Sequence, residues 1–81
     1  MTPKIGQFVN YVILSGEIRP LMVLAVYSNG LIDGVQFRNG SNDDRKDNAG
    51  GADRGKTNCW RPSVKFDEAK RPGSWHFQEA A

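Results

Sequence analysis

The pattern of hydrophobic and polar positions is clearest between Arg19 and Arg38, where two apolar runs flank Asn29-Gly30. An Asn-Gly pair between strand-like runs favours a two-residue type I′ hairpin turn, because both central residues of that turn need a positive φ. The pattern therefore predicts a β-hairpin over residues 19–38, to which the rest of the chain adds further strands.

A two-residue turn fixes which residues of this hairpin share a face, since opposed residues point the same way and faces alternate along each strand. We expect the core face to be the more apolar one, formed by Met22, Leu24, Val26, Leu31, Val35 and Phe37. The second face is mixed and carries Leu21, Val23, Ala25, Tyr27, Ile32, Gly34, Gln36 and Arg38. It is too apolar for water, so another strand of a closed barrel, a second copy or a ligand is expected to cover it. A longer turn would shift the register and exchange the two faces.

Three further segments are predicted to complete a sheet. Residues 5–14 form the first strand, and residues 59–66 a later one in which Trp60, Val64 and Phe66 share a face. Pro62 lacks the N–H that a strand ladder needs, which indicates an edge or a bulge. A single helical turn over residues 67–70, capped by Asp67, precedes a short last strand over residues 74–77.

This order of elements is typical of SH3-like barrels. We therefore predict an all-β fold, a small SH3-like five-stranded barrel formed as one domain by residues 1–81. Residues 78–81 are expected to be a frayed tail.

Residues 39–58 interrupt the pattern with a polar segment that has no apolar side chain larger than alanine. Connections of this length are usually functional or disordered, so we expect a solvated, partly mobile loop or a flap that contacts a ligand or partner. Gly50 to Thr57 matches the phosphate-binding G-x-x-x-x-G-K-[ST] pattern letter for letter. That mechanism needs a buried strand before the loop and a helix after it, and neither is predicted, so the match does not indicate an NTPase. The loop backbone, with Arg54 or Lys56, is still suited to an anion.

Charge and composition give little support to several classes of function. The 81 residues carry 11 basic and 9 acidic side chains, a net charge of +2, with no basic stripe. Charge therefore gives little support to nucleic-acid binding. The first fourteen residues lack a secretory pattern and no apolar run is long enough to span a membrane, so we expect a cytoplasmic protein.

No catalytic or metal-binding pattern is present. His76 is the single histidine and Cys59 the single cysteine. Their spacing resembles no ligand set, and a lone cysteine is more often a small buried hydrophobe than a nucleophile. We expect a protein that is not an enzyme and has no metal or cofactor.

The aromatic and arginine residues suggest ligand binding instead. Trp60 is expected in the core of its strand. Trp75 lies in a short terminal strand and is harder to bury, so it either packs in the core or stacks on a planar ligand. The candidate ligand-binding residues are Trp75, Arg19, Trp60, Arg61, Asn42, Asp43, Arg71 and His76.

Several motifs resemble a widespread family of small phage and prophage proteins. The resemblance is carried by IGQFVNYVIL, by Arg19-Pro20, by VQF followed by NGSND, by Trp60 with Ser63-Val64, and by PGSWHF at residues 72–77. Relatives usually have a shorter loop at residues 44–57, Thr in place of Ser74 and Trp-Pro in place of Phe77-Gln78. The resemblance implies a phage origin and expression in a bacterial host's cytoplasm, and its motif residues form no catalytic set.

These observations lead to two functional hypotheses. The first is a non-catalytic phage accessory protein that binds a small ligand, such as a cyclic nucleotide signal of host antiviral defence, and forms a homo-oligomer through the hairpin at residues 19–38. The alternative is a barrel that binds protein or nucleic acid as a transcription or virion accessory.

Overall fold

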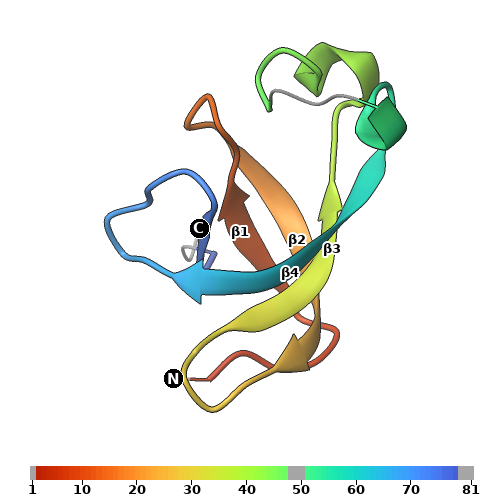
Figure 1. Cartoon of the computed structure of the whole chain (residues 1–81). Coiled ribbons are helices and arrows are strands. Elements are labelled where there is room, and N and C mark those ends of the chain that lie inside the picture. Colours follow the sequence, from red (N-terminus) through yellow and green to blue (C-terminus); the bar gives the residue numbers. More distant parts are fainter. Residues whose placement is uncertain (1, 48–50, 79–81) are drawn as a thin grey trace.

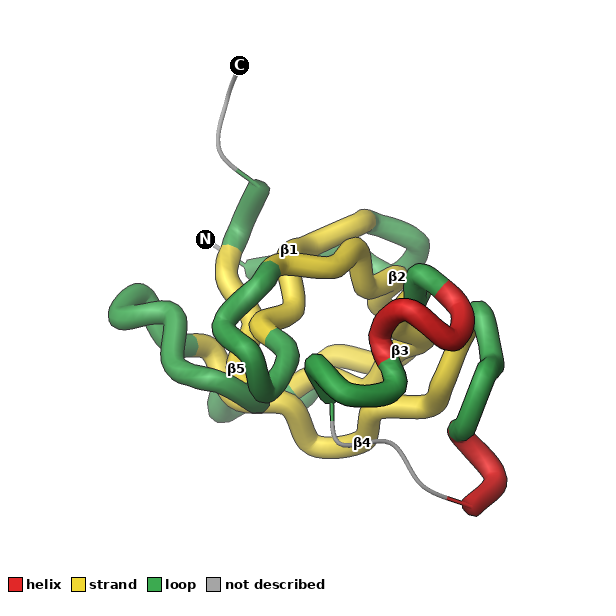
Figure 2. The backbone as a smooth tube through the Cα atoms, turned by 90° about the horizontal axis from the view of Figure 1, so that it is seen from above, coloured by secondary structure: helices red, strands yellow, loops and turns green. Residues whose placement is uncertain are grey.

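The protein folds as a closed antiparallel-rich barrel in the computed structural model, which describes residues 2–47 and 51–78 (Figure 1). Within these residues the strands are β1 (Phe8–Val12), β2 (Ile18–Val26), β3 (Ile32–Phe37), β4 (Asn58–Phe66) and β5 (Ser74–His76). Each strand pairs with the next in sequence, and β5 also pairs with β1 to close the barrel. The view along the barrel in Figure 2 shows the strands as a ring. The predicted all-β fold, consistent with a small SH3-like barrel, is confirmed.

Closure explains why so short a chain leaves few free strand edges. β1 and β5 are antiparallel, whereas β4 and β5 are parallel, with Lys65 opposite Ser74 and Phe66 opposite Trp75. A closed barrel leaves no long unpaired edge to attract another strand. The mixed face of the hairpin was expected to be covered by another strand of a closed barrel, by a second copy or by a ligand. The structure shows the closed barrel.

The turn between β2 and β3 differs from the two-residue turn predicted at Asn29-Gly30. The Tyr27 N–H donates to the Leu31 carbonyl at 2.9 Å, and the Gly30 N–H donates to the Tyr27 carbonyl at 3.2 Å. The loop therefore has three residues, with Gly30 in the left-handed region at φ 83°. A three-residue loop of this kind is a type I turn followed by a left-handed glycine, and it shifts the pairing by one residue.

The two hairpin faces consequently have the opposite roles to those predicted. Leu21, Val23 and Ile32 are fully buried, whereas Leu24 and Phe37 are 39% and 37% exposed. A second register shift at Leu24, between Val23 and Ala25, turns Val26 to the inside, where it packs against the core. Most of the predicted core face is thus the outer face of the barrel, and the interior is lined from the mixed face by Leu21, Val23, Ile32, Gly34 and Gln36.

Glycine at position 34 permits this arrangement. A Cβ there would clash with the carbonyl oxygen of Met22 and with the side chain of Leu21. At this position β3 therefore passes too close to β2 for any side chain. The polar Gln36 next to it is fully buried, and its Oε1 accepts a hydrogen bond from Arg61 Nε at 2.8 Å.

A bulge in β4 breaks the predicted alternation of that strand. Arg61 lies opposite Gly34 and Val64 opposite Ile32, so Pro62 and Ser63 together face one residue of β3. Ser63 has a φ of 52°, which fits a bulged position. The bulge indicated by Pro62 is confirmed, but Trp60 and Val64 lie on opposite sides of the barrel wall.

The two ends of the barrel differ in character. The described residues of the long loop, 39–47 and 51–57, lie at one end, and the β2–β3 turn and the first described residues lie at the other (Figure 1). The hydrophobic core between them consists of Val9, Tyr11, Ile13, Leu21, Val23, Ile32, Val64 and Trp75. Ahead of β5, the predicted helical turn is a hydrogen-bonded turn, in which Asp67 Oδ1 accepts from the Ala69 N–H at 2.8 Å.

Candidate functional site

A groove of about 840 Å³ lies at the barrel end formed by the β2–β3 turn. The turn lines one side of the groove, the end of β4 lines another, and the first residues of the chain contribute Thr2 and Pro3. The remaining lining residues are Val26, Tyr27, Ser28, Asn29, Gly30, Leu31, Lys65, Phe66, Glu68, Trp75 and Phe77. Its size and mixed lining are those of a small-molecule site.

Three aromatic rings form the floor of this groove. The Trp75 ring meets the rings of Phe66 and Phe77 edge-on, with centroid distances of 4.9 and 5.0 Å. Trp75 is only 1% exposed, and its Nε1 donates to the Gly30 carbonyl at 3.1 Å, which ties the floor to the turn. Phe66 is 41% exposed, so its ring is the one available to a ligand.

The β2–β3 turn presents a second exposed ring whose position is fixed by hydrogen bonds. The Tyr27 hydroxyl donates to Asp33 Oδ2 at 2.6 Å, and the other oxygen of Asp33 accepts from the Ser63 N–H at 2.7 Å. The hydrogen bond to Asp33 raises the pKa of Tyr27. The bulge in β4 therefore helps to place Tyr27, because Ser63 belongs to that bulge.

The groove offers few charges. Lys65 and Glu68 line it, and Lys65 makes no ion pair with the residues that the structure describes. Ser28 and Asn29 add neutral polar groups on the turn. The site thus combines exposed aromatic surface with a lysine, a glutamate and hydrogen-bonding groups.

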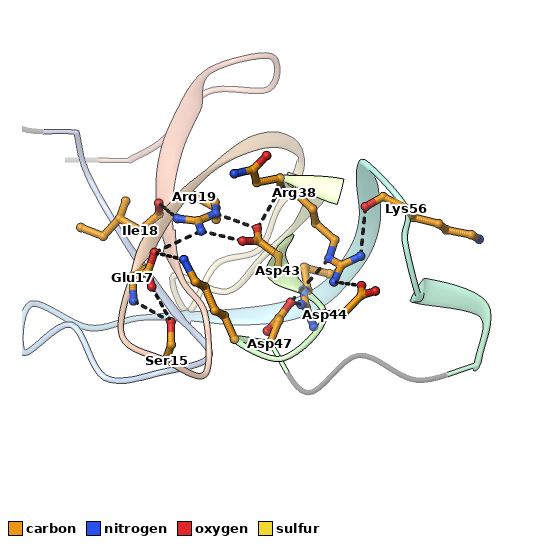
Figure 3. Close-up of polar contacts among 12 residues, drawn as sticks. Ser15, Glu17, Ile18, Arg19, Arg38, Asp43, Asp44, Asp47 and Lys56 are labelled. Atoms are coloured by element: carbon orange, nitrogen blue, oxygen red, sulfur yellow. Dashed lines mark hydrogen bonds and ion pairs between the residues drawn. The ribbon is translucent and has the colours of Figure 1, made fainter. Parts of the chain in front are cut away.

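The opposite end of the barrel holds an ion-pair cluster (Figure 3). Arg19 donates to both oxygens of Asp43, from Nε at 2.7 Å and from Nη2 at 2.6 Å. The Asp43 side chain is fully buried, and its Oδ2 also accepts from the Asn39 N–H at 2.9 Å. These hydrogen bonds, mainly the one from Arg19, lower the pKa of Asp43 to about 2.

A second part of this cluster joins the long loop to β3 and β4. The fully buried side chain of Arg38 binds Asp44 at 3.1 Å and the carbonyls of Asp53 and Lys56 at 2.6 and 3.0 Å. Arg61 pairs with Asp47, and its guanidinium lies 4.9 Å from the centre of the Tyr11 ring.

The described residues of the long loop are thus held to the barrel at several points. They form two short 3-10 turns, Gly40–Asp43 and Gly51–Asp53, instead of one uniformly solvated segment. β4 begins at Asn58, so the residues after Thr57 form a strand and not the helix of a phosphate-binding loop. Gly50 of that motif lies outside the described residues. The Gly55 N–H donates to Asp44 Oδ1 at 2.9 Å, so the anion this backbone holds is the protein's own carboxylate.

The eight residues singled out in the sequence do not converge on one site. Arg19, Asp43 and Arg61 come together in the ion-pair cluster, with Asn42 exposed on the adjacent 3-10 turn. Of the eight candidates, Trp75 is the one that lines the groove at the β2–β3 turn.

The other three residues lie apart from both places. Arg71 is exposed and pairs with Asp67 at 2.9 Å. His76 is buried on β5, with its Nε2 3.3 Å from the side-chain nitrogen of Asn10. Trp60 is 54% exposed on the outer wall of the barrel.

Trp60 is not where it was predicted, whereas Trp75 takes the core position, one of the two left open for it. Trp60, expected in the core, is exposed because the bulge after Arg61 reverses the alternation of β4. Trp75, expected to be hard to bury, is in the core because β5 is enclosed between β1 and β4. Trp75 thus offers no face for stacking.

Sequence reasoning missed Tyr27, Lys65 and Phe66 as groove residues. A three-residue turn would have placed Tyr27 at the turn instead of inside the sheet. Phe66 keeps the inward side predicted for it together with Val64, but it lies at the end of β4, where its ring is 41% exposed beside Trp75. The alternation of β4 gives no signal of this position, since it reports which side a residue faces and not how close it lies to the end of the barrel.

Among the described residues, no three His, Cys, Asp or Glu side chains are placed to hold a metal ion. In the same part of the chain, no helix has the length and apolar character needed to cross a bilayer. No family model matches the chain, and searches of curated proteins and of solved structures found no significant match.

Proposed function

We propose that this protein binds a small planar ligand in the groove between the β2–β3 turn and the end of β4. The observation that carries the proposal is the groove itself, a space of about 840 Å³ that has an aromatic floor and a few polar groups on its walls. Ligand sites in proteins have this composition, with apolar surface for affinity and sparse polar groups for orientation.

The lining favours a flat ring with little charge. Phe66 and Tyr27 are 41% and 47% exposed, and stacking on such a ring contributes about 1–3 kcal/mol per base. Lys65 offers one positive charge to a phosphate, and Glu68 opposes a ligand of high negative charge. A nucleotide with one accessible phosphate therefore fits this lining better than a cyclic trinucleotide.

The biological role we propose follows from the resemblance to small phage proteins. A phage protein that binds a nucleotide without consuming it would sequester a signal of host antiviral defence in the bacterial cytoplasm. The size and lining of the groove support the binding part of this proposal. Sequestration requires binding and no catalytic residue.

Isothermal titration calorimetry against a panel of mononucleotides, cyclic dinucleotides and cyclic ADP-ribose isomers tests the proposal. We expect at least one ligand to bind, with affinity reduced about tenfold or more in Phe66→Ser and in Lys65→Ala. Trp60→Ser is the matched control, because it removes an exposed ring that lies outside the groove. Absence of binding across the panel, or equal loss in the control, would contradict the proposal.

The alternative is a barrel that binds protein or nucleic acid, and the ion pairs bear on its nucleic-acid form. Arg19, Arg38, Lys46, Arg61 and Arg71 each pair with a carboxylate. Paired cations neutralise few phosphates, so this alternative has weaker support. It predicts binding that weakens steeply as salt increases, whereas binding in the groove depends little on salt.

A further inference from the structure

An apolar row crosses the outside of four neighbouring strands. The strand register places Phe8 opposite Met22, Met22 opposite Val35, and Val35 opposite Trp60. All four side chains point away from the core, because their neighbours along each strand point inward. We call these residues the outer row: Phe8 on β1, Met22 on β2, Val35 on β3 and Trp60 on β4.

The two ends of the outer row are exposed, Met22 and Val35 between them are partly buried, and further apolar side chains extend the row. Phe8 is 42% exposed and Trp60 54%. Leu24 and Phe37 lie on the same face, and the rings of Phe37 and Phe8 are 5.9 Å apart. Single exposed hydrophobic residues are normal on protein surfaces, but a contiguous group that crosses several strands marks an interaction site.

On β1, β2 and β4, the positions next to the outer row on the same face carry uncharged side chains. Asn10, Pro20 and Asn58 neighbour the row on the same outer face of β1, β2 and β4. Asp33, towards the β2–β3 turn, is bound to Tyr27 and to the Ser63 N–H. A two-fold symmetric interface brings a surface against itself, which a neutral apolar face tolerates and a charged one does not.

We propose that two copies of this chain associate through the outer row. The small size of the fold favours a second copy over another partner. Ten hydrophobic residues are buried in the core, whereas nine large hydrophobic residues are exposed among those described. Domains of this length bury too little apolar surface to be very stable alone, and self-association supplies more. The types of residue also fit, because Trp, Phe and Met are enriched at interfaces.

An interface that covers the usual share of the surface would give a dimer that dissociates on dilution. A typical interface covers about a tenth of a small protein's surface, which here is about 500 Å² of 5146 Å² per copy. Two such faces bury about 1,000 Å² in total, at the lower limit for specific complexes. The outer row contributes no residue to the groove lining described above, so the dimer leaves both grooves open.

Sedimentation equilibrium over a wide range of concentration tests this proposal. We expect the wild-type mass to rise from 9.0 kDa towards twice that value, whereas Trp60→Lys and Met22→Lys stay at the mass of one chain. Leu14→Lys is the matched control, since Leu14 is 57% exposed outside the outer row, and it should associate like the wild type. Circular dichroism establishes that each variant is folded. A wild type that stays monomeric, or a Trp60→Lys variant that associates normally, overturns the proposal.

Acrylamide quenching of tryptophan fluorescence gives a second readout in the unmodified protein. Trp75 is 1% exposed and Trp60 is 54% exposed, so quenching reports mainly on Trp60. The dimer predicts that quenching weakens as protein concentration rises. Quenching that is independent of concentration would show that Trp60 stays in water, and it would overturn the proposal. That result is the one expected if the face binds another protein or a nucleic acid instead.

Discussion

Arg19 on β2 holds both carboxylate oxygens of Asp43, which lies in the first 3-10 turn of the long loop (Figure 3). The guanidinium fork matches the carboxylate, and both side chains are largely removed from water, with exposures of 16% and 0%. This pair fixes the start of the polar loop to the barrel wall. It accounts for a folded loop segment whose sequence contains no large apolar side chain.

Removal of Arg19 should destabilise the protein markedly. Arg19→Met leaves the buried Asp43 without its charged partner, and we expect the free energy of unfolding to fall by about 2–3 kcal/mol. Lys46→Met is the control, because Lys46 and Glu17 form a pair in which both side chains are more than 40% exposed, and its loss should cost at most about 1 kcal/mol. Urea denaturation measures both. Equal effects of the two variants would contradict a structural role for the buried pair.

The same pair should contribute to acid sensitivity. The pKa of Asp43 is lowered from 3.8 to about 2 in the folded protein, so its contribution to stability is present above pH 3.8 and is lost as pH falls towards 2. We therefore expect the stability difference between the wild type and Asp43→Asn to be largest at neutral pH and to shrink across this range. Thermal unfolding at a series of pH values tests it. A difference that stays constant down to pH 2 would exclude Asp43 as the titrating group.

Exchange of each tryptophan for phenylalanine should separate their roles. Trp75→Phe loses the hydrogen bond to Gly30 and opens space in the core, so we expect a loss of about 2–3 kcal/mol. Trp60→Phe keeps an aromatic ring on the outer wall and should change stability by less than about 0.5 kcal/mol. Denaturation in urea, at concentrations where the chain is monomeric, compares the two. A larger effect at Trp60 would reverse our placement of both residues.

Gly34 should tolerate no side chain. Gly34→Ala adds a Cβ that clashes with the Met22 carbonyl, and a backbone atom of a central strand yields little. We expect a loss of at least about 2 kcal/mol, read as a lower unfolding temperature by calorimetry. A variant as stable as the wild type would show that β2 and β3 are farther apart at this point.

The sequence pattern predicted the elements better than the direction of their side chains. The hairpin, the last strand and barrel closure follow from apolar runs and turn residues, which are local signals. The core face depends on single-residue shifts at Leu24, at the three-residue turn and at Pro62-Ser63. Because faces alternate with a period of two, each such shift moves every later residue to the other side.

The groove was harder to predict than the fold for a related reason. It combines residues from the β2–β3 turn, the end of β4 and β5, which are distant in sequence and meet only after the barrel closes. Arg19, Asp43 and Arg61 have the chemistry of a binding site, but the loop supplies a carboxylate for each arginine, from Asp43 and Asp47. Residue type alone does not distinguish an arginine that binds a ligand from an arginine that pairs with a loop of the same protein.

The most direct test of ligand binding in the groove is a titration followed by amide chemical shifts, using the tightest ligand found by calorimetry. The account predicts shift changes concentrated at Tyr27, Asn29, Lys65, Phe66 and Phe77, with little change at Arg19, Asp43 and Arg61 on the opposite end of the barrel. Shift changes centred on the ion-pair cluster and the long loop, with the groove residues unaffected, would contradict it.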